Sequence, residues 1–199
     1  MTDTTLKQST TAAAAVQHIG KNAVIAVAGS ALVALCAHIA IPLGFTPVPV
    51  TLQPFAVLLL GLLLGPSMGF AALALYLVEG ASGLPVFNPH GPGGLLQLLG
   101  PTGGYLLAAP FAAALAGTIY RLGKRPAVTA VLGALAGDAL LLSVGALWLG
   151  ILERTHASLV LAQSVVPFLG SDAAQLLAAA LCALVLRSFT QRREPLLRA

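Results

Sequence analysis

Two long stretches without a charged residue constrain the fold of this chain more than any other feature. The first runs from residue 22 to residue 78 and the second from residue 80 to residue 120. A helix needs about 20 mainly apolar residues to cross a bilayer, so these stretches alone have room for about four crossings. Only 8% of the residues are charged, whereas soluble domains carry about 25%. The sequence therefore excludes an ordinary soluble domain.

Breaks rich in proline and glycine divide the apolar sequence into six segments. We predict an all-α integral membrane protein with six transmembrane helices. The predicted helices cover residues 22–41, 54–64, 66–80, 105–120, 128–149 and 171–189. Irregular links are expected over residues 42–53, 81–103 and 151–170, because proline cannot donate a helical hydrogen bond and glycine weakens a helix. The transmembrane domain spans residues 22–190, between a mobile N-terminal tail (1–21) and a C-terminal tail (191–199).

The basic residues orient the predicted bundle. With a cytoplasmic N-terminus, only Arg154 of the ten Lys and Arg residues falls on the outer side, as the positive-inside rule expects. The cytoplasmic ones are Lys7, Lys21, Arg121, Lys124, Arg125, Arg187, Arg192, Arg193 and Arg198. This topology places both termini in the cytoplasm of a cell-membrane protein and the three irregular links on its outer face. It predicts an external ligand pocket capped by loops.

The sequence lacks the motifs of common enzymes and metal sites. It contains no Walker A sequence, no HExxH, no GxSxG and no Cys/His cluster with metal-ligand spacing. We therefore expect no enzyme, no metal and no cofactor. The basic residues also lack the aromatic interleaving of a nucleic-acid site. What remains is recognition of a solute by a few polar groups in an apolar pocket.

Asp172 and Gln175 are the first candidates for such polar groups. Their spacing places both on one face of the last predicted helix. A carboxylate accepts hydrogen bonds from ligand N–H groups, and an amide both donates and accepts. Asp172 is equally suited to capping the helix N-terminus, so the residues alone leave both roles open.

Further candidates lie in the predicted outer loops. In the segment GPTGGY (100–105), Gly103 and Gly104 permit a close approach of backbone, and Tyr105 offers a ring and a hydroxyl. Three more are polar groups in otherwise apolar loops, namely Thr51, Gln53 and Asn88. Turn or cap chemistry is the alternative for each of them.

Two acidic residues lie in the predicted helices. Asp138 is near the middle of the fifth, where an ionisable side chain is costly and is a functional-site hypothesis by default. A hydrogen-bonded structural group is the alternative. Glu79 falls at the outer end of the third helix and is expected to be solvated or structural.

Small residues recur every four positions in the first predicted helix, at Ala26, Ser30 and Ala34. Such a face lets another helix approach closely. The neighbour is either a helix of the same bundle or a helix of a partner protein.

Short motifs follow one another in a specific order along the chain. They are IPL (41–43), PVPVTLQ (47–53), GLLLGP (61–66), GLPVF (83–87), GPTGGYL (100–106) and GALWL (145–149). In this order, and over residues 22 to 190, the chain resembles the BioY family, the biotin-binding S components of energy-coupling factor (ECF) transporters.

The resemblance implies a six-helix S-component bundle that binds biotin in a pocket open to the outside. As partners it implies a transmembrane coupling protein and a pair of cytoplasmic ATPases, although some members are thought to work without them. The small-residue face Ala26/Ser30/Ala34 matches the place where S components dock their coupling protein.

The family also carries an acidic residue followed three positions later by lysine at the start of the sixth helix. Asp172 matches this pattern, but Gln175 stands where lysine is expected, so no charge-pair role carries over. Two alternatives therefore stay open. One is an S component for another vitamin, and the other is an autonomous secondary transporter with Asp138 as its ion-coupling group.

Overall fold

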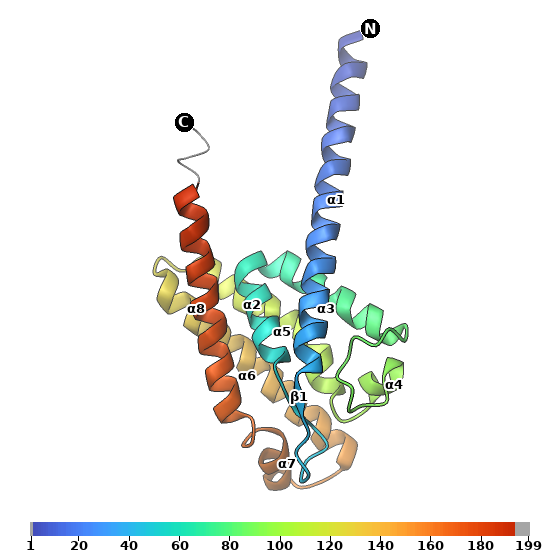
Figure 1. Cartoon of the computed structure of the whole chain (residues 1–199), viewed down its shortest axis with the longest axis vertical. Coiled ribbons are helices and arrows are strands. Elements are labelled where there is room, and N and C mark those ends of the chain that lie inside the picture. The colour runs from blue at the N-terminus through green and yellow to red at the C-terminus, as the bar shows by residue number, and fades with distance from the viewer. Residues whose placement is uncertain (1, 194–199) are drawn as a thin grey trace.

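The computed structural model describes the backbone of residues 2–193 and the side chains of residue 17 and residues 19–189. This part of the chain forms helices and one short β-hairpin (Figure 1). The helices are α1 (Thr2–His38), α2 (Gln53–Leu64), α3 (Pro66–Ala81), α4 (Gly94–Leu99), α5 (Gly103–Leu122), α6 (Pro126–Glu153), α7 (Ala157–Ser164) and α8 (Leu169–Arg193). Strands β1 (Ala40–Ile41) and β2 (Val50–Thr51) pair antiparallel, with Ala40 opposite Thr51.

Among the described residues, four helices are long and apolar enough to cross a membrane. They are α1 over Ile19–His38, α5, α6, and α8 over Leu169–Phe189. Helices α2 and α3 are also apolar but have only 12 and 16 residues, fewer than the roughly 20 that a 30 Å hydrocarbon core requires. All six predicted segments are helical, and four of them satisfy the length and composition of a membrane span.

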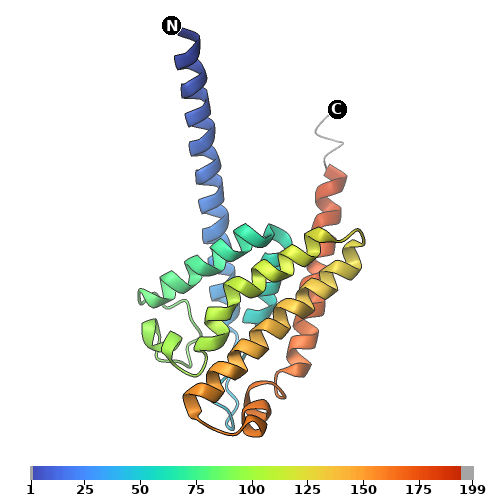
Figure 2. The same ribbon diagram turned by 180° about the vertical axis from the view of Figure 1, so that it is seen from behind.

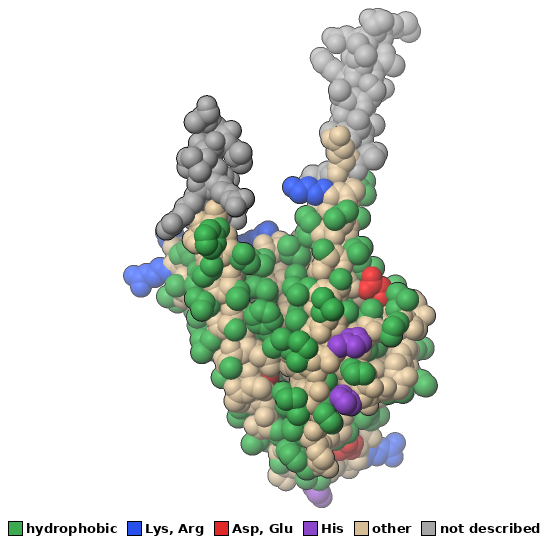
Figure 3. Space-filling view, viewed as in Figure 1, with side chains coloured by type: hydrophobic (Ala, Val, Ile, Leu, Met, Phe, Trp, Pro, Cys, Tyr) green, Lys and Arg blue, Asp and Glu red, His purple; other side chains and the backbone are tan. Residues whose placement is uncertain are grey.

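The surface of the bundle is apolar. Leu35 on α1 and Leu181 on α8 are 69% and 63% exposed. In Figure 3, hydrophobic side chains cover most of the visible face, and Lys and Arg lie near its ends. Soluble monomers rarely expose continuous apolar surface on this scale, so this distribution is that of a membrane protein.

The structure differs from the sequence prediction at the chain ends and in two links. Helix α1 begins at Thr2, so residues 2–21, predicted as a tail, continue the first helix. The predicted C-terminal tail lies largely outside the described residues, as do the side chains of Lys7, Arg192, Arg193 and Arg198. Helices α4 and α7 occupy links that were predicted to be irregular. They have 6 and 8 residues, too few for their periodicity to stand out in the sequence.

Proline and glycine set the helix boundaries. Proline occupies the first or second position of α2, α3 and α6, where its missing N–H is not needed. Gly65 joins α2 to α3 with φ 80°, a left-handed conformation that other residues avoid. These two residue types explain why the breaks were visible in the sequence.

Glycine also brings the central helices into contact. A Cβ atom on Gly61 of α2 would collide with the Ala113 carbonyl oxygen of α5, and one on Gly133 of α6 would lie 2.6 Å from the Ala116 oxygen. Any side chain at these positions would push the helices apart. Glycines on α2 and α6 therefore allow both helices to pack closely against α5.

The small-residue face of α1 packs inside the bundle. Ser30 is fully buried, and its hydroxyl donates a hydrogen bond to the Glu79 carboxylate on α3. Ala34 packs against the main hydrophobic core, and Ala26 is half-buried. Of the face predicted to dock a partner, Ser30 is thus covered in this structure by a helix of the same chain. Glu79 has the structural role that was one of its two expected roles.

Figures 1 and 2 show that α1 and α8 both extend from one end of the bundle, while the β-hairpin, α4 and α7 lie toward the opposite end. The three long links predicted from the sequence are therefore gathered at one end. This arrangement positions the candidate site.

Candidate ligand-binding site

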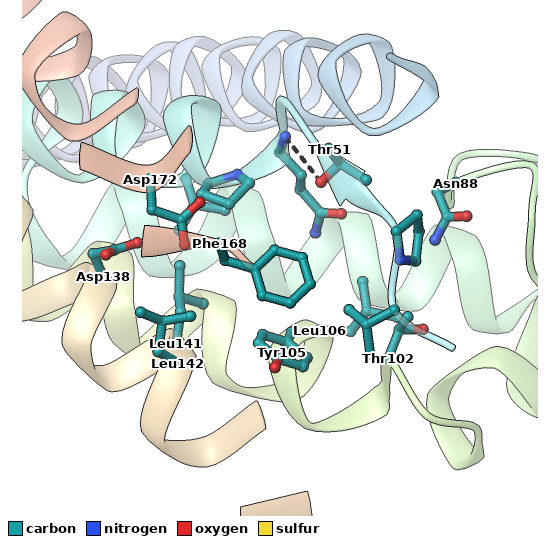
Figure 4. Close-up of a pocket in the computed structure, with 15 residues that line it drawn as sticks. Thr51, Asn88, Thr102, Tyr105, Leu106, Asp138, Leu141, Leu142, Phe168 and Asp172 are labelled. Atoms are coloured by element: carbon teal, nitrogen blue, oxygen red, sulfur yellow. Dashed lines mark hydrogen bonds between the residues drawn. The ribbon is translucent and has the colours of Figure 1, made fainter. Parts of the chain in front are cut away.

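The loop-bearing end of the bundle contains a pocket with mainly apolar walls (Figure 4). Its apolar lining consists of Val48, Pro49, Pro54, Val57, Leu106, Leu141, Leu142 and Phe168. Its polar lining consists of Thr51, Gln53, Asn88, Thr102, Tyr105, Asp138 and Asp172. Apolar walls with a few convergent polar groups are typical of sites for small organic molecules.

Helix α6 supplies one wall. Asp138, Leu141 and Leu142 are spaced three and four residues apart, so they share one helix face. The glycine before them allows this face to come close to its neighbours, since a Cβ atom on Gly137 would lie 2.7 Å from Leu58 Cδ2. The tight helix contact therefore brings Asp138 to the pocket.

The start of α8 supplies a second wall. The Asp172 backbone N–H donates to the Phe168 carbonyl over 2.8 Å, so both residues lie on the same turn and line the pocket. Asp172 is only 5% exposed. Its carboxylate receives a long hydrogen bond of 3.4 Å from the Ser171 hydroxyl. A carboxylate can accept several hydrogen bonds, so Asp172 can also accept one from a ligand.

Gln175 supports the wall without lining it. Its Oε1 accepts a hydrogen bond from the Phe55 N–H over 3.1 Å, and its Nε2 donates to the Thr51 carbonyl over 3.1 Å. Both ends of the amide are thus occupied by the backbone that leads into α2. Gln175 was predicted to bind substrate; in this structure its side chain turns toward this backbone and is not part of the pocket lining.

The hairpin and the loop before α4 present the polar groups expected of them. The Thr51 hydroxyl accepts a hydrogen bond from the Gln53 N–H over 3.3 Å, drawn as a dashed line in Figure 4. Asn88 Oδ1 accepts from the His90 N–H over 3.0 Å. The buried Gln97 side chain holds the same loop, because its Nε2 donates to the Asn88 carbonyl over 3.4 Å. These local bonds fix Thr51 and Asn88 at the pocket.

The GPTGGY segment has two separate roles. Tyr105 lines the pocket, and its hydroxyl donates to the Ser164 carbonyl over 2.6 Å, which ties α5 to α7. Gly103 and Gly104 do not line it. A Cβ atom on Gly104 would collide with the Trp148 side chain of α6. These two glycines were predicted to contact substrate; in this structure they allow close packing of α5 against α6 and against the α4 turn.

The polar groups are distributed unevenly along the pocket. In Figure 4, Asp138 and Asp172 lie at one end, Asn88 and Thr102 lie at the other, and the Phe168 and Tyr105 rings lie between them. Among the described residues, no Lys, Arg or His lines the pocket. One end is therefore acidic and the other is neutral and polar.

The pocket is narrow in this conformation. Its cavity has a volume of about 70 Å³, less than the roughly 150 Å³ that accommodates a benzene molecule in a protein interior. The hairpin loop is joined to α7, because the Thr46 hydroxyl donates to the Gln163 carbonyl over 2.8 Å. A larger ligand requires movement of these loops.

Comparison with known proteins places the chain in a family. The model of the BioY family matches residues 7–192. This chain belongs to the BioY family. A probable biotin transporter BioY of Pyrococcus horikoshii is 39% identical over 71% of this chain and 81% of its own length. The biotin transporter BioY of Thermotoga maritima is 36% identical over 82% of this chain and 94% of its own length.

A solved structure extends the similarity to the whole fold. It is the crystal structure of the S-component for biotin from an ECF-type ABC transporter. It superposes with a TM-score of 0.77, is 26% identical, and covers 86% of this chain and 93% of that one. The fold described above is therefore that of a BioY S component.

In this BioY protein the pocket brings together five of the eight predicted substrate-binding residues. They are Thr51, Gln53, Asn88, Tyr105 and Asp172. It adds Thr102, which sequence reasoning missed although it lies inside the GPTGGY motif, and Asp138, which was singled out as an intramembrane acid without being assigned to the site. The apolar lining residues carry no signal that separates them from other residues of apolar helices.

Proposed function

We propose that this protein is the biotin-specific substrate-binding membrane subunit of a vitamin uptake transporter. The observation that carries the proposal is the apolar pocket with the buried Asp172 carboxylate, in a chain of the BioY family. Biotin combines an apolar thiophane ring with a cyclic urea that has two N–H donors. Apolar walls suit the ring, and a carboxylate suits the donors.

The charges of the pocket favour one orientation of biotin. Its tail carries a carboxylate, which would be repelled by the acidic end at Asp138 and Asp172. At that end the N–H groups of the cyclic urea can donate to Asp172. The tail would then extend toward Asn88 and Thr102, whose amide and hydroxyl can donate to a carboxylate.

We propose that six helices, including the short α2 and α3, cross the cell membrane with both termini in the cytoplasm. Two observations support this arrangement. The basic residues satisfy the positive-inside rule in that topology, and the three long links, which contain only Glu153 and Arg154 as charged residues, lie at the end opposite to the extensions of α1 and α8. The pocket would then open to the outside, with the hairpin, the loop around α4, and α7 as its cap.

Delivery to the cytoplasm would require an ECF module consisting of a transmembrane coupling protein and two ATPases. The sequence has no Walker A motif, so nucleotide hydrolysis would take place on a partner. Helix α1 offers such a partner the exposed side chains of Val24, Val27 and Leu35, in place of the buried Ser30. Uptake of biotin by vesicles that lack any ATPase would instead favour an autonomous transporter.

The test is calorimetric titration of biotin into the purified, detergent-solubilised protein. The Asp172→Asn variant should bind biotin about 10-fold to 100-fold more weakly, because a hydrogen bond to a charged group contributes about 1.5–3 kcal/mol. Glu153→Gln, an exposed residue outside the pocket lining, is the matched control and should bind like wild type. Absence of biotin binding by folded wild type, or binding of thiamine or riboflavin in its place, would overturn the assignment to biotin.

A further inference from the structure

Asp138 is a buried acid that lines the pocket, yet one of its oxygens has no hydrogen-bond partner. The residue is 5% exposed, and its Oδ1 is buried and unpaired. A buried carboxylate oxygen without a donor is unfavourable, and the cost is larger for a charged group than for a neutral one. A ligand in the pocket could supply the missing donor from outside the chain.

The surroundings of Asp138 offer no positive charge. Its own helix places Leu141 and Leu142 beside it in the lining, and the preceding Gly137 packs against Leu58 of α2. Among the described residues that line the pocket, the other ionisable acid is Asp172, and none is basic. Asp138 therefore forms no salt bridge with another described residue of the pocket lining.

Asp138 and Asp172 occupy the same end of the pocket although they come from different helices. Figure 4 shows their carboxyl groups next to each other, Asp138 from α6 and Asp172 from α8. Two neighbouring acids repel each other unless donors lie between or beside them. A ligand ring with two N–H groups supplies two such donors.

We propose that Asp138 is a second ligand-binding acid, which with Asp172 forms a subsite for a ring that carries two N–H donors and no negative charge. This inference rests on the proposed function and deepens it. Each acid accepts a hydrogen bond from one nitrogen of the cyclic urea. The pair therefore determines specificity at the ring end of the ligand, and a cyclic guanidinium, which has the same shape and a positive charge, is also a ligand for it.

The first test compares biotin with 2-iminobiotin, in which a cyclic guanidinium replaces the cyclic urea. Both ligands are titrated into wild type and into Asp138→Asn, which keeps the shape of the side chain and removes its charge. The ratio of iminobiotin affinity to biotin affinity should fall about tenfold or more in the variant, because the guanidinium loses one charged acceptor. Loss of folded protein lowers the binding of both ligands equally. The ratio of the two affinities therefore reports recognition of the ring and not the folding of the variant.

The matched control is Glu79→Gln, which removes an acid from the bundle but not from the pocket lining. Its affinity ratio should equal that of wild type. An unchanged ratio in Asp138→Asn would overturn the inference and leave the proposed function intact. Failure of wild type to bind biotin would overturn both.

A second test uses wild type alone, in case Asp138→Asn does not fold. Methylation of either ureido nitrogen of biotin removes one of the two donors. Both N-methyl derivatives should bind about tenfold more weakly or worse than biotin, because each nitrogen has its own acid. If one of them binds as tightly as biotin, only one N–H is recognised and Asp138 is not a ligand-binding residue.

Discussion

The side-chain amide of Gln175 on α8 donates a hydrogen bond to the backbone carbonyl of Thr51, 124 residues earlier in the chain. The same amide accepts a hydrogen bond from the Phe55 N–H. It thereby joins α8 to the backbone on both sides of Gln53, which lines the pocket. A residue outside the lining thus fixes the shape of one wall.

Replacing Gln175 by leucine should destabilise the protein and weaken biotin binding together. The change leaves the Phe55 N–H and the Thr51 carbonyl unpaired, and each such group costs about 1–3 kcal/mol. Lysine keeps a donor for Thr51 but offers no acceptor to Phe55, so Gln175→Lys should lie between leucine and wild type. Thermal unfolding in detergent measures the order of the three proteins.

The control for Gln175 is Thr118→Val. The Thr118 hydroxyl is exposed and donates only to the Ala114 carbonyl of its own helix, over 2.7 Å, so its loss should change the unfolding temperature little. If Gln175→Leu unfolds at the temperature of wild type, the amide does not hold the wall.

Replacing Ser30 by leucine should destabilise the isolated protein by about 1–3 kcal/mol, the usual cost of overpacking a core. Ser30 is fully buried and bonded to Glu79, whereas its neighbour Ala31 is exposed. Ala31→Leu therefore introduces the same side chain on the outer face and should leave stability nearly unchanged. Thermal unfolding without any partner protein measures both, and equal stability of the two variants would contradict the internal role of Ser30.

Replacing Gly104 by alanine should separate α5 from α6. The new methyl group would collide with the Trp148 side chain and lie 2.9 Å from the Val144 carbonyl oxygen, so we expect a loss of about 1–3 kcal/mol. Around Gly44 there is no neighbouring atom within 4 Å, which makes Gly44→Ala the matched control. A Gly104→Ala protein as stable as Gly44→Ala would show that the two helices can adjust.

Replacing Thr46 by valine should speed the release of biotin. The hydroxyl of Thr46 joins the hairpin loop to α7, and loss of a hydrogen bond of about 1 kcal/mol should raise the dissociation rate roughly fivefold. Dissociation of radiolabelled biotin measures the rate. Ser82→Ala, which removes an exposed hydroxyl bonded within its own segment, should release biotin like wild type. An unchanged rate for Thr46→Val would mean that this loop is not part of the cap.

Features of the sequence that act locally were predictable. Uncharged apolar runs indicated membrane helices because desolvation of each segment depends on its own side chains. Proline and glycine marked the breaks, as at Gly65 and Pro66. Proline restricts the backbone at its own position and glycine makes it more flexible, so both effects are local. The order of short motifs likewise indicated the family, and Asp172, which was singled out from its place at the start of a helix, lines the pocket.

The tertiary structure decided which face of each helix meets which neighbour. Ser30 and Glu79 are 49 residues apart, and Gln175 contacts backbone more than a hundred residues earlier. Any face of an apolar helix can contact either lipid or protein, so hydropathy does not show which face is buried in the bundle. Helix packing therefore decides whether Gln175 reaches the ligand or the backbone, and whether Asp138 faces lipid or the pocket. Glycines such as Gly133 and Gly137 determine this packing, because they let α6 approach its neighbours closely.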